Sequence, residues 1–70
     1  MMKNDSFLKE MGSKIKEARL KKGMSLSKLS ELSKIDMSNI WFIENGKRNV
    51  HILTLKSFAD VFGMDVKDFL

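Results

Sequence analysis

The stretch SLSKLSELSKIDMSNIWFIENGKRN, residues 25–49, decides the fold of this chain of 70 residues. It contains two short helical patterns, and each is preceded by a residue whose side-chain oxygen can cap a helix, Ser25 and Asp36. The second pattern stops at Gly46, and glycine is the residue that most often follows a helix in the left-handed conformation. The stretch therefore predicts two short helices joined by a tight turn at residues 34–36.

Apolar residues at helical spacing continue on both sides of this stretch. They predict one helix that ends at Gly23 and another that ends at Gly63. The residues expected to face the core are Leu8, Met11, Ile15, Ala18, Leu26, Leu29, Leu32, Ile40, Ile43, Ile52, Leu55, Phe58, Ala59 and Phe62. Asp65 can cap a last short turn. Since no segment alternates with the period of a β-strand, the sequence predicts a compact all-α domain of five helices over residues 7–70, preceded by a short flexible arm over residues 1–6.

The composition excludes several classes of function. The chain has a single histidine, His51, and no cysteine, so the groups of a nucleophilic triad or a zinc site are missing. Its four glycines lie too far apart to form a phosphate-binding loop. We therefore expect no enzymatic activity, no metal site and no cofactor. No stretch is long and apolar enough to span a membrane, and no signal-peptide pattern is present, so we expect a cytoplasmic protein.

The distribution of charge indicates an anionic partner. The net charge is +4, with +4 on residues 1–22, −1 on residues 23–46, +3 on residues 47–58 and −2 on residues 59–70. Two consecutive short helices followed by the Lys-Arg-Asn sequence of residues 47–49 suit helix-turn-helix binding of double-stranded DNA, in which cationic and amide groups hold the phosphates. From charge alone, a solvated lysine-rich surface without a partner stays an alternative.

Two segments, GMSLSKLS at residues 23–30 and IENGKRN at residues 43–49, resemble the phage-repressor (Cro and XRE-type) helix-turn-helix family. The resemblance runs without gaps over about residues 11–70, and a narrower one points to restriction-modification controller proteins. It implies a lambda-repressor-like domain that binds a palindromic operator as a homodimer. The chain departs from the family at Leu26, where many members carry a DNA-contacting glutamine, and at Lys34, where a glycine is common in the turn.

The outward face of the second motif helix is expected to read base edges, because amide, hydroxyl and apolar groups all have partners in the major groove. The residues assigned to this role are Met37, Ser38, Asn39 and Phe42. Asn39 can pair with both groove-facing atoms of an adenine. The residues expected to hold phosphates are Arg19, Ser25, Lys28, Lys47, Arg48 and Asn49. The family resemblance also implies an ion pair between Arg19 and Glu44.

Apolar residues gather at the C-terminal end beside an acidic rim, and they predict a dimer interface away from DNA. They are Phe62, Met64, Val66, Phe69 and Leu70, and the alternative is that they cap the core of the single chain. Trp41 is left open between the rim of the core, DNA and a protein partner. The sequence thus predicts a homodimeric transcriptional regulator; the alternative is a protein-interaction module, such as the antitoxin of a toxin–antitoxin pair.

Overall fold

The computed structural model describes residues 3–70. Its regular elements are α1 (Lys3–Lys21), α2 (Leu26–Ser33), α3 (Met37–Glu44), α4 (Ile52–Phe62) and the 3-10 helix η1 (Val66–Phe69). The predicted all-α class is confirmed, and the described residues contain no strand. The described residues form four α-helices and not five, because the capped segment after α4 is a single 3-10 turn.

The first helix begins earlier than the sequence predicts. The flexible arm expected over residues 1–6 is helical from Lys3 onward, and residues 1–2 lie outside the described part of the chain. No glycine or proline precedes Met11 to break the helix, so it extends through the segment that we expected to be an arm.

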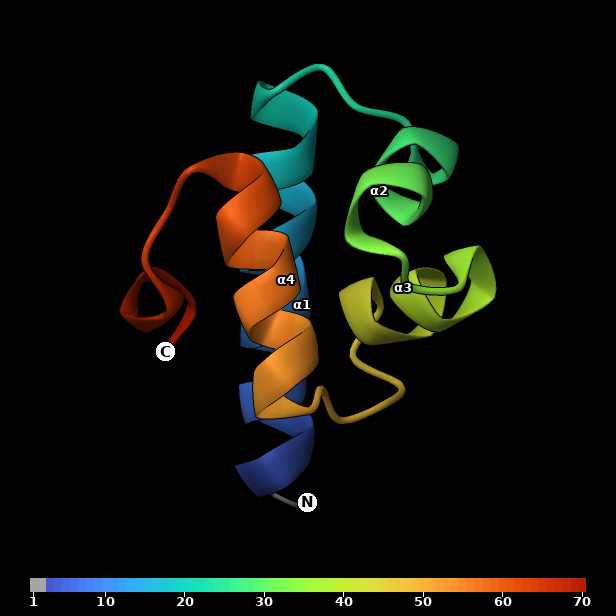
Figure 1. Cartoon of the computed structure of the whole chain (residues 1–70). Coiled ribbons are helices and arrows are strands. Elements are labelled where there is room, and N and C mark those ends of the chain that lie inside the picture. The colour runs from blue at the N-terminus through green and yellow to red at the C-terminus, as the bar shows by residue number, and fades with distance from the viewer. Residues whose placement is uncertain (1–2) are drawn as a thin grey trace.

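The core lies between α1 and the three shorter α-helices. In Figure 1, α4 runs along α1 on one side of the molecule, while α2 and α3 lie on the other side and η1 flanks α4. The buried apolar residues are Met11, Ile15, Ala18, Leu29, Ile40, Ile43, Leu55, Phe58, Ala59, Phe62 and Phe69. Most of the predicted apolar positions are therefore buried.

Two of those positions are exposed, Leu32 at 46% and Ile52 at 60%. Within α2, Leu29 and Ser33 are the buried residues, and this orientation turns Leu32 to the edge of the packed face. Ile52 is the first residue of α4 and precedes the turn at Leu55 from which that helix is buried. The prediction that Leu32 and Ile52 face the core was wrong.

Serine side chains close the turn between α2 and α3. Ser30 Oγ donates to the Ile35 carbonyl at 2.6 Å, and Ser33 Oγ donates to the Leu29 carbonyl at 2.7 Å. Ser33 Oγ also accepts from the Ile35 amide at 3.3 Å. Between them, Lys34 caps α2 in the left-handed conformation, with φ of 66°. A side chain in that conformation costs about 1 kcal/mol relative to glycine, so these hydrogen bonds hold a strained turn in place.

Gly12 lies inside α1, where that helix crosses the end of α3. A Cβ atom at this position would lie 2.3 Å from the Ile43 carbonyl oxygen and 2.6 Å from that of Glu44. These distances are too short for any side chain, so glycine allows the last turn of α3 to contact the α1 backbone directly.

Candidate nucleic-acid interface

A buried ion pair ties the end of α3 to α1. Arg19 Nε donates to Glu44 Oε2 at 2.7 Å, and Nη2 donates to Oε1 at 3.0 Å. The third nitrogen, Nη1, donates to the Met24 carbonyl at 2.8 Å. The structure therefore contains the expected pair. The phosphate contact assigned to Arg19 does not fit, because its side chain is buried and each of its nitrogens already donates inside the protein.

The first turn of α2 presents a hydroxyl and a cation to solvent. Ser25 Oγ caps the helix by accepting from the Lys28 amide at 3.0 Å, and both residues are exposed. The Lys28 ammonium lies 3.5 Å from Glu31, in a pair that is more than half exposed on both sides. Exposed pairs of this kind are weak. Lys28 can therefore exchange Glu31 for an external anion at little cost, as a phosphate contact requires.

The N-terminus of α3 is fixed by its cap. Asp36 accepts hydrogen bonds from the amide and the hydroxyl of Ser38. The Ser38 hydroxyl and then the Asn39 amide lower the pKa of Asp36 below its usual value, so the carboxylate is charged at neutral pH. Because the Ser38 hydroxyl donates its hydrogen bond to Asp36, its oxygen is available to accept a hydrogen bond from an external donor.

The side chains assigned to base reading lie on the outer face of α3. Met37, Ser38 and Trp41 are exposed, while Asn39 and Phe42 are half-buried. Trp41 is 43% exposed and meets Phe42 edge to face, with ring centroids 5.2 Å apart. It therefore belongs to the outer surface of α3 and not to the core.

One contact in this region is not predicted from the sequence. Arg48 folds back from the loop after α3, and its guanidinium carbon lies 4.5 Å from the centroid of the Phe42 ring. Arg48 Nη1 also donates to Asn39 Oδ1 at 2.9 Å. Stacking of an arginine on an aromatic ring is favourable, so the pose is stabilised by two contacts. Pairing of Asn39 with both groove atoms of an adenine then requires Arg48 to leave the Asn39 carbonyl.

The basic loop starts at a hydrogen-bonded helix end. The Lys47 amide donates to the Phe42 carbonyl at 2.9 Å, and the Gly46 amide donates to the Ile43 carbonyl at 3.1 Å. Gly46 adopts the left-handed conformation that this pair of bonds needs, with φ of 69°. The exposed residues 47–49 therefore follow closely on the C-terminal end of α3.

The residues assigned to a dimer interface divide into two groups. Phe62 and Phe69 are each 1% exposed and belong to the core of the single chain, and Val66 packs against that core. Only Met64 and Leu70 are exposed, at 37% and 61%. The expected surplus of apolar surface was therefore overestimated, because both phenylalanines pack into the core of their own chain.

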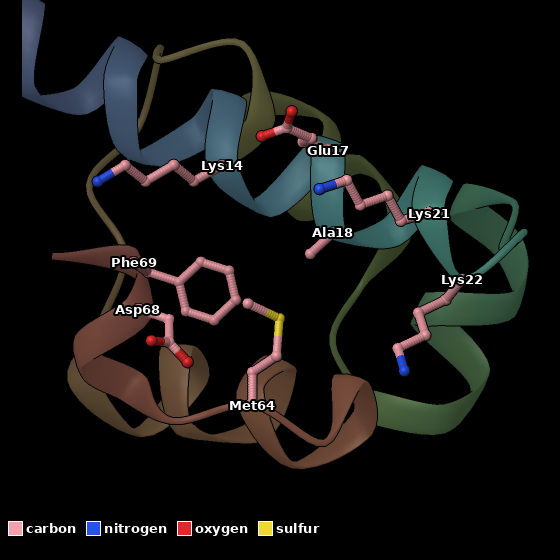
Figure 2. A pocket seen from close by; sticks show the side chains of 8 residues that line it. All are labelled: Lys14, Glu17, Ala18, Lys21, Lys22, Met64, Asp68 and Phe69. Carbon is pink, nitrogen blue, oxygen red and sulfur yellow. The ribbon is translucent and has the colours of Figure 1, made fainter.

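Figure 2 shows this packing from close by. Phe69 and Met64 point toward Ala18 of α1 across a small pocket. Lysines of α1 surround the opening of this pocket; they are Lys14, Lys21 and Lys22. The C-terminal segment thus packs onto α1 of its own chain.

In the part of the chain that the structure describes, no three His, Cys, Asp or Glu residues gather in a way that could hold a metal ion. Over the same residues, no helix has the length and apolar character needed to cross a membrane.

The helix pair and its caps agree with a known family. Residues 15–69 match the family model described as Helix-turn-helix, HTH_3. The chain belongs to this family. The resemblance to Cro and XRE-type proteins seen in the sequence is thereby confirmed. A comparison with the curated proteins finds no match.

Solved structures similar to this HTH_3 chain include the restriction-modification controller protein C.AhdI from Aeromonas hydrophila. It is 28% identical, with 93% of this chain and 98% of that one covered and a TM-score of 0.89. The DNA-binding domain of BldD is also 28% identical, with 94% and 96% covered and a TM-score of 0.84. The clp gene regulator ClgR from Corynebacterium glutamicum is 25% identical, with 90% and 67% covered and a TM-score of 0.85.

Proposed function

We propose that this HTH_3 protein is a transcriptional regulator that binds double-stranded DNA sequence-specifically, as a homodimer on a palindromic operator. One observation carries the proposal: the exposed residues on the outer face of α3 are uncharged, and exposed cations stand on the elements before and after it, Lys28 on α2 and Lys47 and Arg48 in the following loop. Such a surface suits the major groove, whose base edges are flanked by phosphates on both sides. Family membership and the similarity to C.AhdI and BldD support the same function.

In this proposal, α3 enters the major groove with its N-terminal turn deepest. Ser38 and Asn39 meet polar base atoms, while Met37 and Phe42 meet apolar ones. The groups around α3 hold the two phosphate backbones and set its depth; they are Ser25, Lys28, Lys47, Arg48 and Asn49. Phosphate contacts position the helix and carry no base information, so specificity comes from α3.

A homodimer is supported by apolar side chains that are exposed outside α3. Ile52 and Leu53 of α4 are 60% and 75% exposed, and Met64 and Leu70 are exposed on the C-terminal segment. In Figure 1, η1 lies on the opposite side of α1 and α4 from α3. Two copies joined through this surface would present two α3 helices to successive major grooves, so the half-sites would lie about one helical turn apart.

Selection of bound duplexes from a random pool, repeated at two salt concentrations, tests the proposal. We expect a palindromic sequence whose binding weakens steeply with salt. Lys28→Ala should weaken binding on every sequence, whereas the matched control Lys67→Ala, on η1, should leave it unchanged. If no sequence is selected and binding does not depend on salt, the proposal is wrong, and the protein-interaction module becomes the better reading.

A further inference from the structure

An apolar hollow opens between α2 and α3 on the surface that we assign to DNA. The residues that line it are Leu26, Met37, Ser38, Trp41 and Phe42. None of them carries a charge, and four of the five are apolar or aromatic. The edge-to-face contact of Trp41 with Phe42, at an interplanar angle of 83°, gives the hollow a shaped wall.

The rest of the chain leaves the apolar side chains on the α3 wall of the hollow exposed. Met37 and Trp41 are 48% and 43% exposed, so their apolar surface stays in water in the single chain. Leu26 is half-buried on the opposite wall. Both walls of the hollow are therefore apolar.

The surroundings of the hollow indicate what fills it. The Arg48 guanidinium lies over the ring of Phe42, which lines the hollow. A cation at the edge of the hollow complements a duplex, whose phosphates flank the groove, whereas an apolar peptide would give it no partner. The apolar group that the major groove offers is the 5-methyl group of thymine.

We propose that this hollow binds the 5-methyl group of one thymine in each operator half-site. Specificity at that base pair then comes from the methyl group and not from a hydrogen bond. Met37, Trp41 and Leu26 surround the methyl group, and Ser38 stands at the edge to meet a polar base atom. The inference rests on the proposed DNA-binding function.

Replacement of thymine by deoxyuridine tests the proposal, because it removes only the methyl group and leaves the base pair otherwise unchanged. In the selected operator, each thymine is replaced in turn and the dissociation constant is measured. We expect one symmetric position at which binding weakens about fourfold per half-site, equivalent to roughly 0.8 kcal/mol for one methyl group transferred from water. Other positions should change less.

Variants locate the methyl group in the hollow. Met37→Ala and Trp41→Ala should each bind the thymine and deoxyuridine operators almost equally, while the matched control Leu20→Ala, an exposed apolar residue of α1, should keep the full difference. Thermal melts establish that each variant is folded. Discrimination that persists in both Met37→Ala and Trp41→Ala would overturn the proposal.

The outcomes separate this inference from the function on which it rests. A protein that selects a palindrome but tolerates deoxyuridine at every position would overturn the methyl site and leave the proposed function intact. A protein that binds no duplex at all would overturn both.

Discussion

Removal of the Glu44 carboxylate tests how α3 is held on α1. Glu44→Ala would leave Arg19 buried with one of its three hydrogen bonds, the one to Met24. Breaking one side of a buried ion pair costs about 3–5 kcal/mol. A smaller term opposes this loss, because Glu44 is the last residue of α3 and its charge there is unfavourable with the helix dipole by about 0.3–1 kcal/mol. We therefore expect a net loss of about 3 kcal/mol in the free energy of unfolding.

Urea unfolding followed by circular dichroism at pH 7 measures this change. In a domain of this size, a loss of 3 kcal/mol lowers the thermal midpoint by on the order of 12–24 °C. The matched control is Asp60→Ala, which breaks the Lys56–Asp60 pair. That pair has a similar N–O distance, 2.8 Å against 2.7 Å, but its side chains are 60% and 63% exposed. We expect the control to change stability by less than about 1 kcal/mol.

The comparison isolates burial as the cause, since distance is nearly the same in the two pairs. Equal effects of Glu44→Ala and Asp60→Ala would refute the reasoning. A double variant, Arg19→Met with Glu44→Leu, should recover part of the lost stability, because an apolar pair leaves no buried charge without a partner.

Three further predictions concern the turn, the cap and the basic loop. Lys34→Gly should raise the free energy of unfolding by about 0.5–1 kcal/mol by removing left-handed strain, while Lys34→Ala should not, as urea midpoints would show. Asp36 has a lowered pKa in the folded state, so its stabilising effect is complete above its usual value of 3.8 and is lost as the pH falls through the lowered value. The difference in urea midpoint between the wild type and Asp36→Asn should accordingly be constant near neutral pH and shrink in acid; a constant difference at all pH values would contradict this. Lys47→Ala should weaken binding equally on all sequences and flatten the log–log salt slope by about one unit, whereas Arg48→Ala should also alter the preference at the base that Asn39 meets, as repeated selections would reveal.

The helix boundaries and caps of the motif could be predicted because their causes lie within a few residues. Ser25, Asp36 and Gly46 each act on backbone groups two to four positions away, and all three stand where the sequence places them. Lys34 stands at a turn position where the resembling family commonly has glycine, and in the structure it adopts the left-handed conformation. Pattern reasoning therefore recovered the elements that form the reading unit.

Burial and side-chain contacts depended on the packing of distant elements. Ile52 shares the spacing of the buried face of α4 but lies beyond the reach of the core, and Phe69 is buried because it packs beside Ala18 of α1 and Phe62 of α4. The hydrogen bond between Arg48 and Asn39 depends on how the loop after α3 folds back, and no periodicity in the sequence indicates this path. The sequence thus predicted the helices of the motif more reliably than which side chains on their surface touch one another.

The close backbone contact at Gly12 means that the residues that hold α3 on α1 differ from the residues exposed on its outer face. The last turn of α3 is seated on α1 through main-chain atoms and the Arg19–Glu44 pair, whereas Met37, Ser38 and Trp41 are exposed on its outer face. Substitutions at these three positions would therefore leave the contacts between the last turn of α3 and α1 in place. If α3 reads the operator as proposed, substitutions on its outer face would produce regulators that bind a different operator. The orientation of α3 on α1 would stay the same in these variants.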